Sequence, residues 1–252
     1  MQMPDTQATE QLSIIFQDKF LIAIQKPAGL LVHKSPIDKH ETSYAMKILR
    51  NQIDQWVYPV HRLDKPTSGL LLFALHSEIA SQLSSDFENR LVNKTYQAIV
   101  RGYTPTNGEI NHPLKEIAVF KHMQKQLQKK DPKEAVTHYE RMCSFELPFS
   151  DGRFPSSRYS HIQLKPTTGR KHQIRRHLKH ISHPIIGDVK YGKGEHNRLF
   201  KENFDSHRLL LAATKLTFNH PVTGQNVTLE CPLEESFTKA LTNLTPYEAK
   251  PD

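Results

Sequence analysis

Cysteine is scarce in this 252-residue chain, which contains only Cys143 and Cys231. Two cysteines far apart in strand-like segments do not form a disulfide framework, and no Cys-x-x-Cys pair indicates a zinc or redox motif. We expect both to be small core residues of a reduced, cytoplasmic protein. The cysteine content therefore argues against a disulfide-stabilised secreted protein.

Long apolar runs are also absent. The longest, residues 70–75, is far shorter than the ~20 residues that a membrane-spanning helix needs. Residues 1–11 are polar and lack the basic start and apolar stretch of a secretory signal, so we expect a disordered N-terminal tail there. The sequence predicts a cytoplasmic protein with no membrane partner.

Cofactor-binding motifs are missing as well. The ten glycines form neither a Gly-x-Gly-x-x-Gly fingerprint nor a complete Walker loop. Fifteen histidines are present, but His172, His177, His180 and His183 match no zinc-protease or zinc-finger spacing, and no acid lies among them. The sequence therefore predicts no organic cofactor and no metal.

Basic residues outnumber acidic ones by 34 to 26, which gives a formal net charge of +8. This balance does not indicate a fold, but it favours a polyanionic partner. Lysines gather in the segment 120–133, where Lys121 and Lys125 are candidate nucleic-acid contacts. The segment is equally well explained as a solvated loop, and the pattern does not decide between the two.

Alternation and turn residues predict many strands and few helices. Strands are expected at residues 12–16, 20–24, 30–33, 70–75, 96–101, 136–147, 159–165, 215–218 and 225–230. Helical spacing is found at residues 41–55, 77–91 and 170–181. Because no βαβ rhythm is present, these elements predict an α+β fold around a mixed, mostly antiparallel sheet with flanking helices.

The most informative stretch is residues 61–70, His-Arg-Leu-Asp-Lys-Pro-Thr-Ser-Gly-Leu. It places the Asp64 carboxylate between two cations. Pro66 keeps Lys65 out of the helical region, and residues 67–69 supply turn chemistry before the buried strand. A rigid loop at the end of a core strand often presents a catalytic group, although an aspartate there can also simply close an Asx-turn.

The same stretch resembles the catalytic signature of the RluA-type pseudouridine synthases. Two further blocks follow in the family's order: Lys-Thr-Tyr-Gln-Ala-Ile-Val at residues 94–100 and Gly-Arg-Lys-His-Gln-Ile-Arg-Arg-His-Leu at residues 169–178. Lys-Pro-Ala-Gly at residues 26–29 and His-Pro-Ile-Ile-Gly-Asp at residues 183–188 also fit. Five ordered blocks, within a resemblance that covers about residues 12–232, are far more specific than any one of them.

The resemblance implies the pseudouridine synthase catalytic fold, with an active-site cleft across the sheet. We expect this fold to occupy residues 12–245 as a single domain, without a separate N-terminal RNA-binding domain. Residues 246–252 are expected to form a C-terminal tail, and the protein is expected to be a monomer.

The resemblance also implies isomerisation of uridine to pseudouridine, in which the C1′–N1 bond breaks and C1′ joins C5. No redox change or group transfer occurs, which agrees with the predicted lack of a cofactor. The target base must be flipped out of its stack, at a cost of a few kcal/mol. Asp64 is expected to act at the sugar, either by attacking C1′ or by removing the 2′ proton, and the sequence leaves this choice open.

Four further residues are expected to support Asp64. The family pattern assigns Arg175 as its ion-pair partner, because an opposite charge favours the ionised carboxylate. Tyr96 is expected to stack on the uracil, with Ile174 as the neighbouring apolar wall. Arg62 is expected to take the place of the extruded base, since a planar guanidinium can stack and hold phosphate.

Residues 170–181 carry an apolar stripe beside a flank of cations. On pattern alone this is a surface helix with solvated cations, but such cations can also bind phosphates. Arg175 borders the stripe and is expected to point into the cleft. The remaining cations are RNA-binding candidates: Arg170, Lys171, Arg176 and Lys179.

Within the family, the chain is most similar to members that modify tRNA. The similarity lies in the basic segment 115–134, the strand at residues 135–139 and the doubled arginine at residues 175–176. It implies a tRNA partner and, as the target, the T-stem uridine that tRNA numbering calls 65. Ribosomal RNA is the alternative substrate, because the catalytic blocks do not distinguish RNA classes.

Two other classes of function compete with a modifying enzyme. One is an RNA-binding module without catalysis, and the other is a metal-assisted nuclease built on histidine and aspartate. A pure binder gives no reason for Asp64, Tyr96 and Arg175 to occur together in the family's order. The isomerase is therefore the favoured hypothesis.

Overall fold

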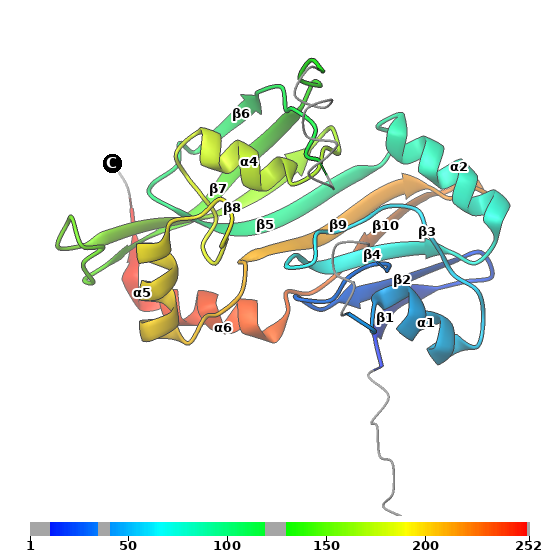
Figure 1. Cartoon of the computed structure of the whole chain (residues 1–252), viewed down its shortest axis with the longest axis horizontal. Helices are drawn as coiled ribbons and strands as arrows, with labels where there is room; N and C mark the ends of the chain where they lie inside the picture. The colour runs from blue at the N-terminus through cyan, green and yellow to red at the C-terminus, as the bar shows by residue number, and fades with distance from the viewer. Residues whose placement is uncertain (1–10, 35–40, 119–129, 251–252) are drawn as a thin grey trace, which may run out of the picture.

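A large mixed sheet with helices on both faces forms the framework of the chain (Figure 1). The computed structural model describes residues 11–34, 41–118 and 130–250. The strand order is β1-β2-β4-β9-β5-β8-β7-β11, with β3 beside β4, β10 beside β9 and β6 beside β7. All pairs are antiparallel except β4 with β9. The predicted fold class, a mixed and mostly antiparallel sheet with flanking helices, is confirmed.

The strands are β1 (Ser13–Gln17), β2 (Leu21–Lys26), β3 (Tyr58–Pro59), β4 (Ser68–Ala74), β5 (Asn93–Arg101), β6 (Asn107–Asn111), β7 (Val136–Leu147), β8 (Ser157–Pro166), β9 (Leu211–Asn219), β10 (Asn226–Glu230) and β11 (Glu248–Ala249). The helices are α1 (Ala45–Ile53), α2 (Ser77–Glu88), α4 (Gln173–His180), α5 (Gly194–Phe204), α6 (Glu235–Leu244) and the 3-10 turn η2 (Thr245–Tyr247). None of the helices in these described ranges is long and apolar enough to cross a membrane.

Strand alternation assigns the helices to opposite faces of the sheet. On β5, Ile99 packs into the cluster formed by α5 and α6, whereas Ala98 and Val100 pack with Ile174 and Leu178 of α4. Successive residues of a strand point to opposite faces, so one strand serves both layers. Figure 1 shows α4 above the sheet and α5 and α6 below it.

Strand β4 is buried along its whole length. Leu71 and Phe73 pack with Leu49 of α1, while Leu70 and Leu72 belong to the cluster on the other face. A strand covered on both sides reads as a continuous apolar run rather than an alternating one. The predicted buried strand at residues 70–75 is therefore confirmed, and it follows directly on the Asp64 loop.

Two sequence predictions are wrong. Residues 30–33 do not form a strand, because the carbonyls of Leu31 and Val32 accept hydrogen bonds from the N–H groups of Ala45 and Met46 at 2.8 and 3.0 Å. These carbonyls accept hydrogen bonds from N–H groups in the first turn of α1, which have no acceptor within the helix. The predicted tail at residues 246–252 contains β11, which pairs with β7.

Lys121, Lys125 and residues 1–10 lie outside the described residues.

The only parallel contact in the described sheet joins β4 to β9 through two residue pairs, Ser68 with Ala212 and Gly69 with Ala213. Gly69 adopts φ +105°, a region that L side chains rarely enter. A Cβ at this position would lie 2.0 Å from the Ala213 carbonyl oxygen. The absence of a side chain at Gly69 therefore allows the two strands to approach one another immediately after the Asp64 loop.

Gly69→Ala is expected to lower the free energy of unfolding by at least ~3 kcal/mol, because backbone strain and steric overlap add at one position. Denaturant unfolding measures the change. Gly29→Ala (φ +87°, no atom within 4 Å) introduces strain alone, and Gly194→Ala introduces neither. The expected order of loss is Gly69, then Gly29, then Gly194. Equal losses at Gly69 and Gly29 would show that the close approach to β9 is unimportant.

Candidate active site

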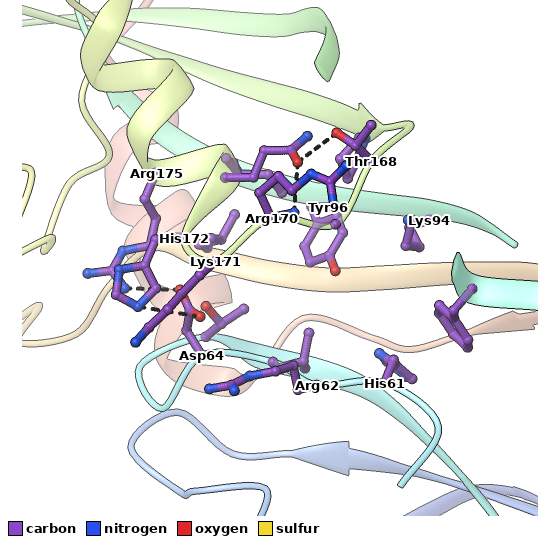
Figure 2. Close-up of a pocket in the computed structure, with 18 of the residues that line it drawn as sticks. His61, Arg62, Asp64, Lys94, Tyr96, Thr168, Arg170, Lys171, His172 and Arg175 are labelled. Carbon is purple, nitrogen blue, oxygen red and sulfur yellow. Dashed lines mark hydrogen bonds and ion pairs between the residues drawn. The ribbon is translucent and has the colours of Figure 1, made fainter. Parts of the chain in front are cut away.

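A cavity of about 480 Å³ lies between α2 and the start of α4 (Figure 2). Its walls come from the loop after β3, from α2, from β5 and from the loop between β8 and α4. Seven of the predicted site residues line it: Arg62, Asp64, Tyr96, Arg170, Lys171, Ile174 and Arg175. Arg176 and Lys179 lie outside the lining, on the same helix as Arg175.

The loop that carries Asp64 is held by its own backbone. The Asp64 carbonyl accepts a hydrogen bond from the Thr67 N–H at 3.0 Å, and the Lys65 carbonyl accepts one from Gly29 at 2.9 Å. The buried ammonium of Lys26 donates to the carbonyl of Lys65 at 3.2 Å and to those of Pro27 and Leu30. Lys26 therefore joins two loops below Asp64.

Burial lowers the pKa of Lys26 to about 7, with Glu234 opposing the shift. Three carbonyl acceptors match the three donors of an ammonium group and favour its charged form. Lys26 belongs to the Lys-Pro-Ala-Gly block at residues 26–29, and no role was predicted for its side chain from the sequence. The structure shows that Lys26 holds the loop that carries Asp64.

Two side chains approach the Asp64 carboxylate from α4 and the residue before it. Arg175 Nη1 lies 3.0 Å from one oxygen, and His172 Nε2 lies 3.8 Å from the other. The Asp64 side chain is 16% exposed and that of Arg175 is 6% exposed. The structure thus brings together the predicted pair, with one carboxylate oxygen held by Arg175 and the other less constrained.

Arg175 is held in turn by a second carboxylate, that of Asp188. Its Nε and Nη2 donate to the two oxygens of Asp188 at 2.7 and 2.9 Å. The backbone N–H groups of Lys190 and Tyr191 also donate to Asp188. Burial raises the pKa of Asp188, but these donors outweigh it and the pKa lies below its usual value.

Asp188 was part of the block at residues 183–188 but was given no role from the sequence. The available signal was an acid that directly follows a buried apolar pair and a glycine, where a charge needs a partner. With Asp188 in place, the Arg175 guanidinium keeps both its charge and its orientation. Burial opposes that charge, but the two carboxylates raise the pKa of Arg175.

His172 begins the helix in a left-handed conformation, with φ 56°. Its Nδ1 lies 2.9 Å from the hydroxyl of Tyr191, whose ring is 5.1 Å from the Arg175 guanidinium carbon. Burial lowers the pKa of His172 to about 4, although Asp64 opposes the shift. His172 therefore faces Asp64 as a neutral ring at neutral pH.

The backbone turn that presents His172 is fixed by Gln173. Its amide oxygen accepts hydrogen bonds from the Thr168 hydroxyl at 2.7 Å and the Arg170 N–H at 3.0 Å. Its amide nitrogen donates to the Val136 carbonyl at 2.9 Å. The pattern predicted a helix from residue 170. This network explains why α4 begins at Gln173 instead.

Tyr96 enters the cavity from β5 at a local irregularity. The register between β5 and β9 shifts between Thr95 and Tyr96, and such a bulge re-aims the following side chain. Burial and the charge of Asp64 raise the pKa of Tyr96, so the phenol stays protonated. Ile174 is 7% exposed beside it, and Figure 2 shows Arg62 on the opposite wall.

His61 supports the opposite wall, a role that the sequence did not indicate. Its ring stacks on Phe87 of α2 with centroids 4.6 Å apart, and its Nε2 accepts the Leu72 N–H at 3.0 Å. Burial, and then Lys94, lower the pKa of His61 to about 3. The neutral ring ties the loop after β3 to both α2 and β4.

Two of the predicted RNA-binding arginines contact the backbone at the two ends of the basic segment 115–134. Arg170 Nε donates to the Glu134 carbonyl at 3.1 Å, and Arg176 Nη1 donates to the Lys115 carbonyl at 2.9 Å. Lys171 lines the cavity, and Lys179 lies 6.0 Å from the Tyr191 ring. Both arginines thus have a structural contact in addition to the RNA contact predicted for them.

Potential metal ligands do not cluster within residues 11–34, 41–118 and 130–250. The histidines singled out in the sequence have other neighbours. His177 Nδ1 lies 3.0 Å from the Thr137 hydroxyl, and His183 Nδ1 lies 2.8 Å from the Arg101 carbonyl. His180 stacks on the ring of His112.

Asp188→Asn is expected to destabilise the fold by ~3 kcal/mol at pH 7, because Arg175 loses a buried charged partner. The pKa of Asp188 is lower in the folded chain than in the unfolded one, so its charge stabilises the fold above the unfolded pKa of ~3.9. The difference from wild type should therefore shrink as the pH falls below ~4. Urea unfolding across pH measures it.

Asp205→Asn is the matched control, since Asp205 is exposed and pairs with His207 and Lys239 at the surface. It should change stability little at neutral pH. A loss for Asp188→Asn no greater than that for Asp205→Asn would contradict the structural role of the buried pair.

Comparison with known proteins places this geometry in a family. The family model described as RNA pseudouridylate synthase matches residues 20–180. The chain is 47% identical over 236 residues to tRNA pseudouridine synthase C of Vibrio parahaemolyticus, covering 93% of this chain and 96% of that protein. It is 51% identical over 219 residues to the protein of that name from Pasteurella multocida, covering 86% and 90%.

A solved structure agrees with the sequence relatives. Human RNA Pseudouridylate Synthase Domain Containing 4 superposes with a TM-score of 0.69 and 26% identity, and the match covers 95% of each chain. The blocks that resembled the RluA-type enzymes lie within, or just beyond, the residues that the family model matches. The chain therefore belongs to the RNA pseudouridylate synthase family, whose members are isomerases.

Proposed function

We propose that this chain converts a uridine of tRNA to pseudouridine, with Asp64 as the catalytic residue. The observation that carries the proposal is the placement of Asp64 in the cavity, paired with Arg175 and beside Tyr96. The tRNA substrate is supported by relatives named tRNA pseudouridine synthase C, which match over most of their length.

The cavity is suited to a single flipped nucleotide. Its volume of about 480 Å³ falls within the ~300–1,000 Å³ of small-molecule sites. Tyr96 offers an aromatic face for the uracil, and Ile174 an apolar wall. Arg62 has no hydrogen-bond or ion-pair partner among the described residues, so its guanidinium is available to fill the space that the base leaves in the RNA.

Asp64 acts at the sugar through its less constrained oxygen, while Arg175 holds the other. That oxygen either attacks C1′ or removes the 2′ proton, and both routes require the ionised carboxylate. The C1′–N1 bond breaks, the base turns, and C1′ joins C5. C5 then loses its proton and N1 gains one, so the product is an isomer of the substrate.

The target within tRNA is uridine 65 of the T-stem. That base lies in a duplex, so the enzyme must hold the surrounding helix by its phosphates while one nucleotide swings out. Cations line the cavity from both sides, including Arg62 on one wall and Lys171 on the other. A positively charged rim around a small cavity suits a compact stem.

Asp64→Asn should lower activity ~1,000-fold or more, while the fold and RNA binding are retained. An amide can neither attack C1′ nor accept the 2′ proton, and Arg175 keeps its two hydrogen bonds to Asp188. Tritium release from RNA that contains 5-tritiated uridine measures the reaction, and thermal unfolding checks the fold. Activity within about tenfold of wild type, a barrier change of ~1.4 kcal/mol, would remove Asp64 from the chemistry.

Incubation with unmodified tRNA should yield pseudouridine at one T-stem position, detected by carbodiimide mapping. Ribosomal RNA fragments of similar length are the matched competitors, and Asp64→Asn is the negative control. Modification confined to ribosomal RNA would reject the tRNA substrate and leave only the reaction type. Modification of tRNA at another position would reject uridine 65 alone.

A further inference from the structure

An exposed ion pair stands at the wall of the cavity, between the end of α2 and the start of β7. Arg90 Nη2 lies 2.6 Å from one oxygen of Glu134, and Arg90 Nη1 lies 3.3 Å from the other. Arg90 itself lines the cavity. The two side chains are 44% and 55% exposed, and such solvent-accessible pairs are weak.

A second arginine of the cavity wall also meets Glu134. Arg170 donates from Nε to the Glu134 backbone carbonyl. Hydrogen bonding to Arg90, with a further contribution from the charge of Arg170, lowers the pKa of Glu134. A single ionised carboxylate therefore sits where two guanidinium groups of the cavity wall converge.

Lys94 adds a third cation to this wall. It lines the cavity and has no hydrogen-bond or ion-pair partner within the described parts of the chain. Burial lowers the pKa of Lys94, and the positive charge of Arg90 lowers it further. Arg90 and Lys94 thus repel each other, and an anion that reached both would relieve this repulsion.

We propose that Arg90, Lys94 and Arg170 form a phosphate subsite, and that Glu134 occupies the phosphate's place until RNA binds. This inference rests on the proposed function, because it requires an RNA substrate. A carboxylate and a phosphodiester both match the fork of a guanidinium group. A backbone phosphate that meets Lys94 as well as Arg90 gains a contact that Glu134 does not make, and so displaces it.

Binding is measured in the Asp64→Asn background, so that catalysis does not intervene. The probes are an unmodified tRNA transcript and an RNA hairpin with a duplex stem, over a series of salt concentrations. Glu134→Gln should bind each probe about threefold more tightly, since it removes the competing charge. Arg90→Ala should bind several-fold more weakly. The slope of its log affinity against log salt concentration should become shallower by about the amount of one phosphate contact.

The control for added positive charge is Asp205→Asn, which removes the carboxylate of an exposed ion pair with Lys239 on the α5–α6 face (Figure 1). It should leave affinity unchanged. The Arg90→Ala, Glu134→Gln double variant should bind like Arg90→Ala, because among the described residues the Glu134 carboxylate forms its hydrogen bonds with Arg90, whereas Arg170 bonds the backbone carbonyl.

Three results would overturn the subsite. The first is that Glu134→Gln gains no more affinity than Asp205→Asn. The second is that Glu134→Gln still tightens binding when Arg90 is replaced by alanine. The third is that no variant binds RNA. The proposed function is tested separately by modification of tRNA by the wild type. If the wild type left tRNA unmodified but Glu134→Gln still tightened hairpin binding, the tRNA assignment would fail and the phosphate subsite would stand.

Discussion

The guanidinium of Arg175 connects two parts of the chain that are 124 residues apart. It pairs with Asp64, in the loop before β4, and with Asp188, in the loop after α4. Both contacts use separate nitrogen atoms, so neither carboxylate competes with the other. Because Asp188 binds Nε and Nη2 and the guanidinium is planar, the direction of Nη1 is fixed toward Asp64. The position of the Asp64 carboxylate therefore depends on a residue that does not touch it.

The backbone around this arginine has little freedom. Gly69 lets β4 approach β9 directly after the Asp64 loop, and Lys26 donates hydrogen bonds to three carbonyls beneath that loop. Gln173 fixes the turn from which α4 starts. Each contact constrains a loop end rather than a strand centre. The sheet thus acts as a rigid support whose strand ends carry the chemistry.

Much of the fold was predictable from local patterns. The hairpin of β1 and β2, the buried β4, the long pair β7 and β8, and the late hairpin of β9 and β10 all follow from alternation and turn residues. Helices α5 and α6 were missed, since each has only a few apolar residues, such as Phe200 and Phe237, among many polar ones. The strand wrongly predicted at residues 30–33 failed because the first turn of α1, 14 residues further along the chain, uses the carbonyls of Leu31 and Val32.

At the site, the sequence predicted the residues and the pairing of Asp64 with Arg175, but not the contacts that hold this pair in place. Asp64 and Arg175 came from the family's blocks, and the structure shows them paired. Asp188, His61 and the backbone contacts of Arg170 and Arg176 depend on contacts between residues remote in sequence. No periodicity encodes such contacts, because periodicity describes one element at a time. A buried acid in a matching block was the one local signal available.

The pairing of one arginine with two aspartates also sets the charge of the cavity floor. Two carboxylates and one guanidinium leave a net charge of −1 within this cluster, and the ring of His172 beside it is neutral at neutral pH. The rest of the lining is rich in cations, among them Arg62, Lys94 and Lys171. A phosphate is thus repelled from the floor and attracted to the rim, whereas an uncharged base meets no such barrier. The cavity can therefore orient an entering nucleotide by charge, base inward and backbone outward, before any specific contact forms.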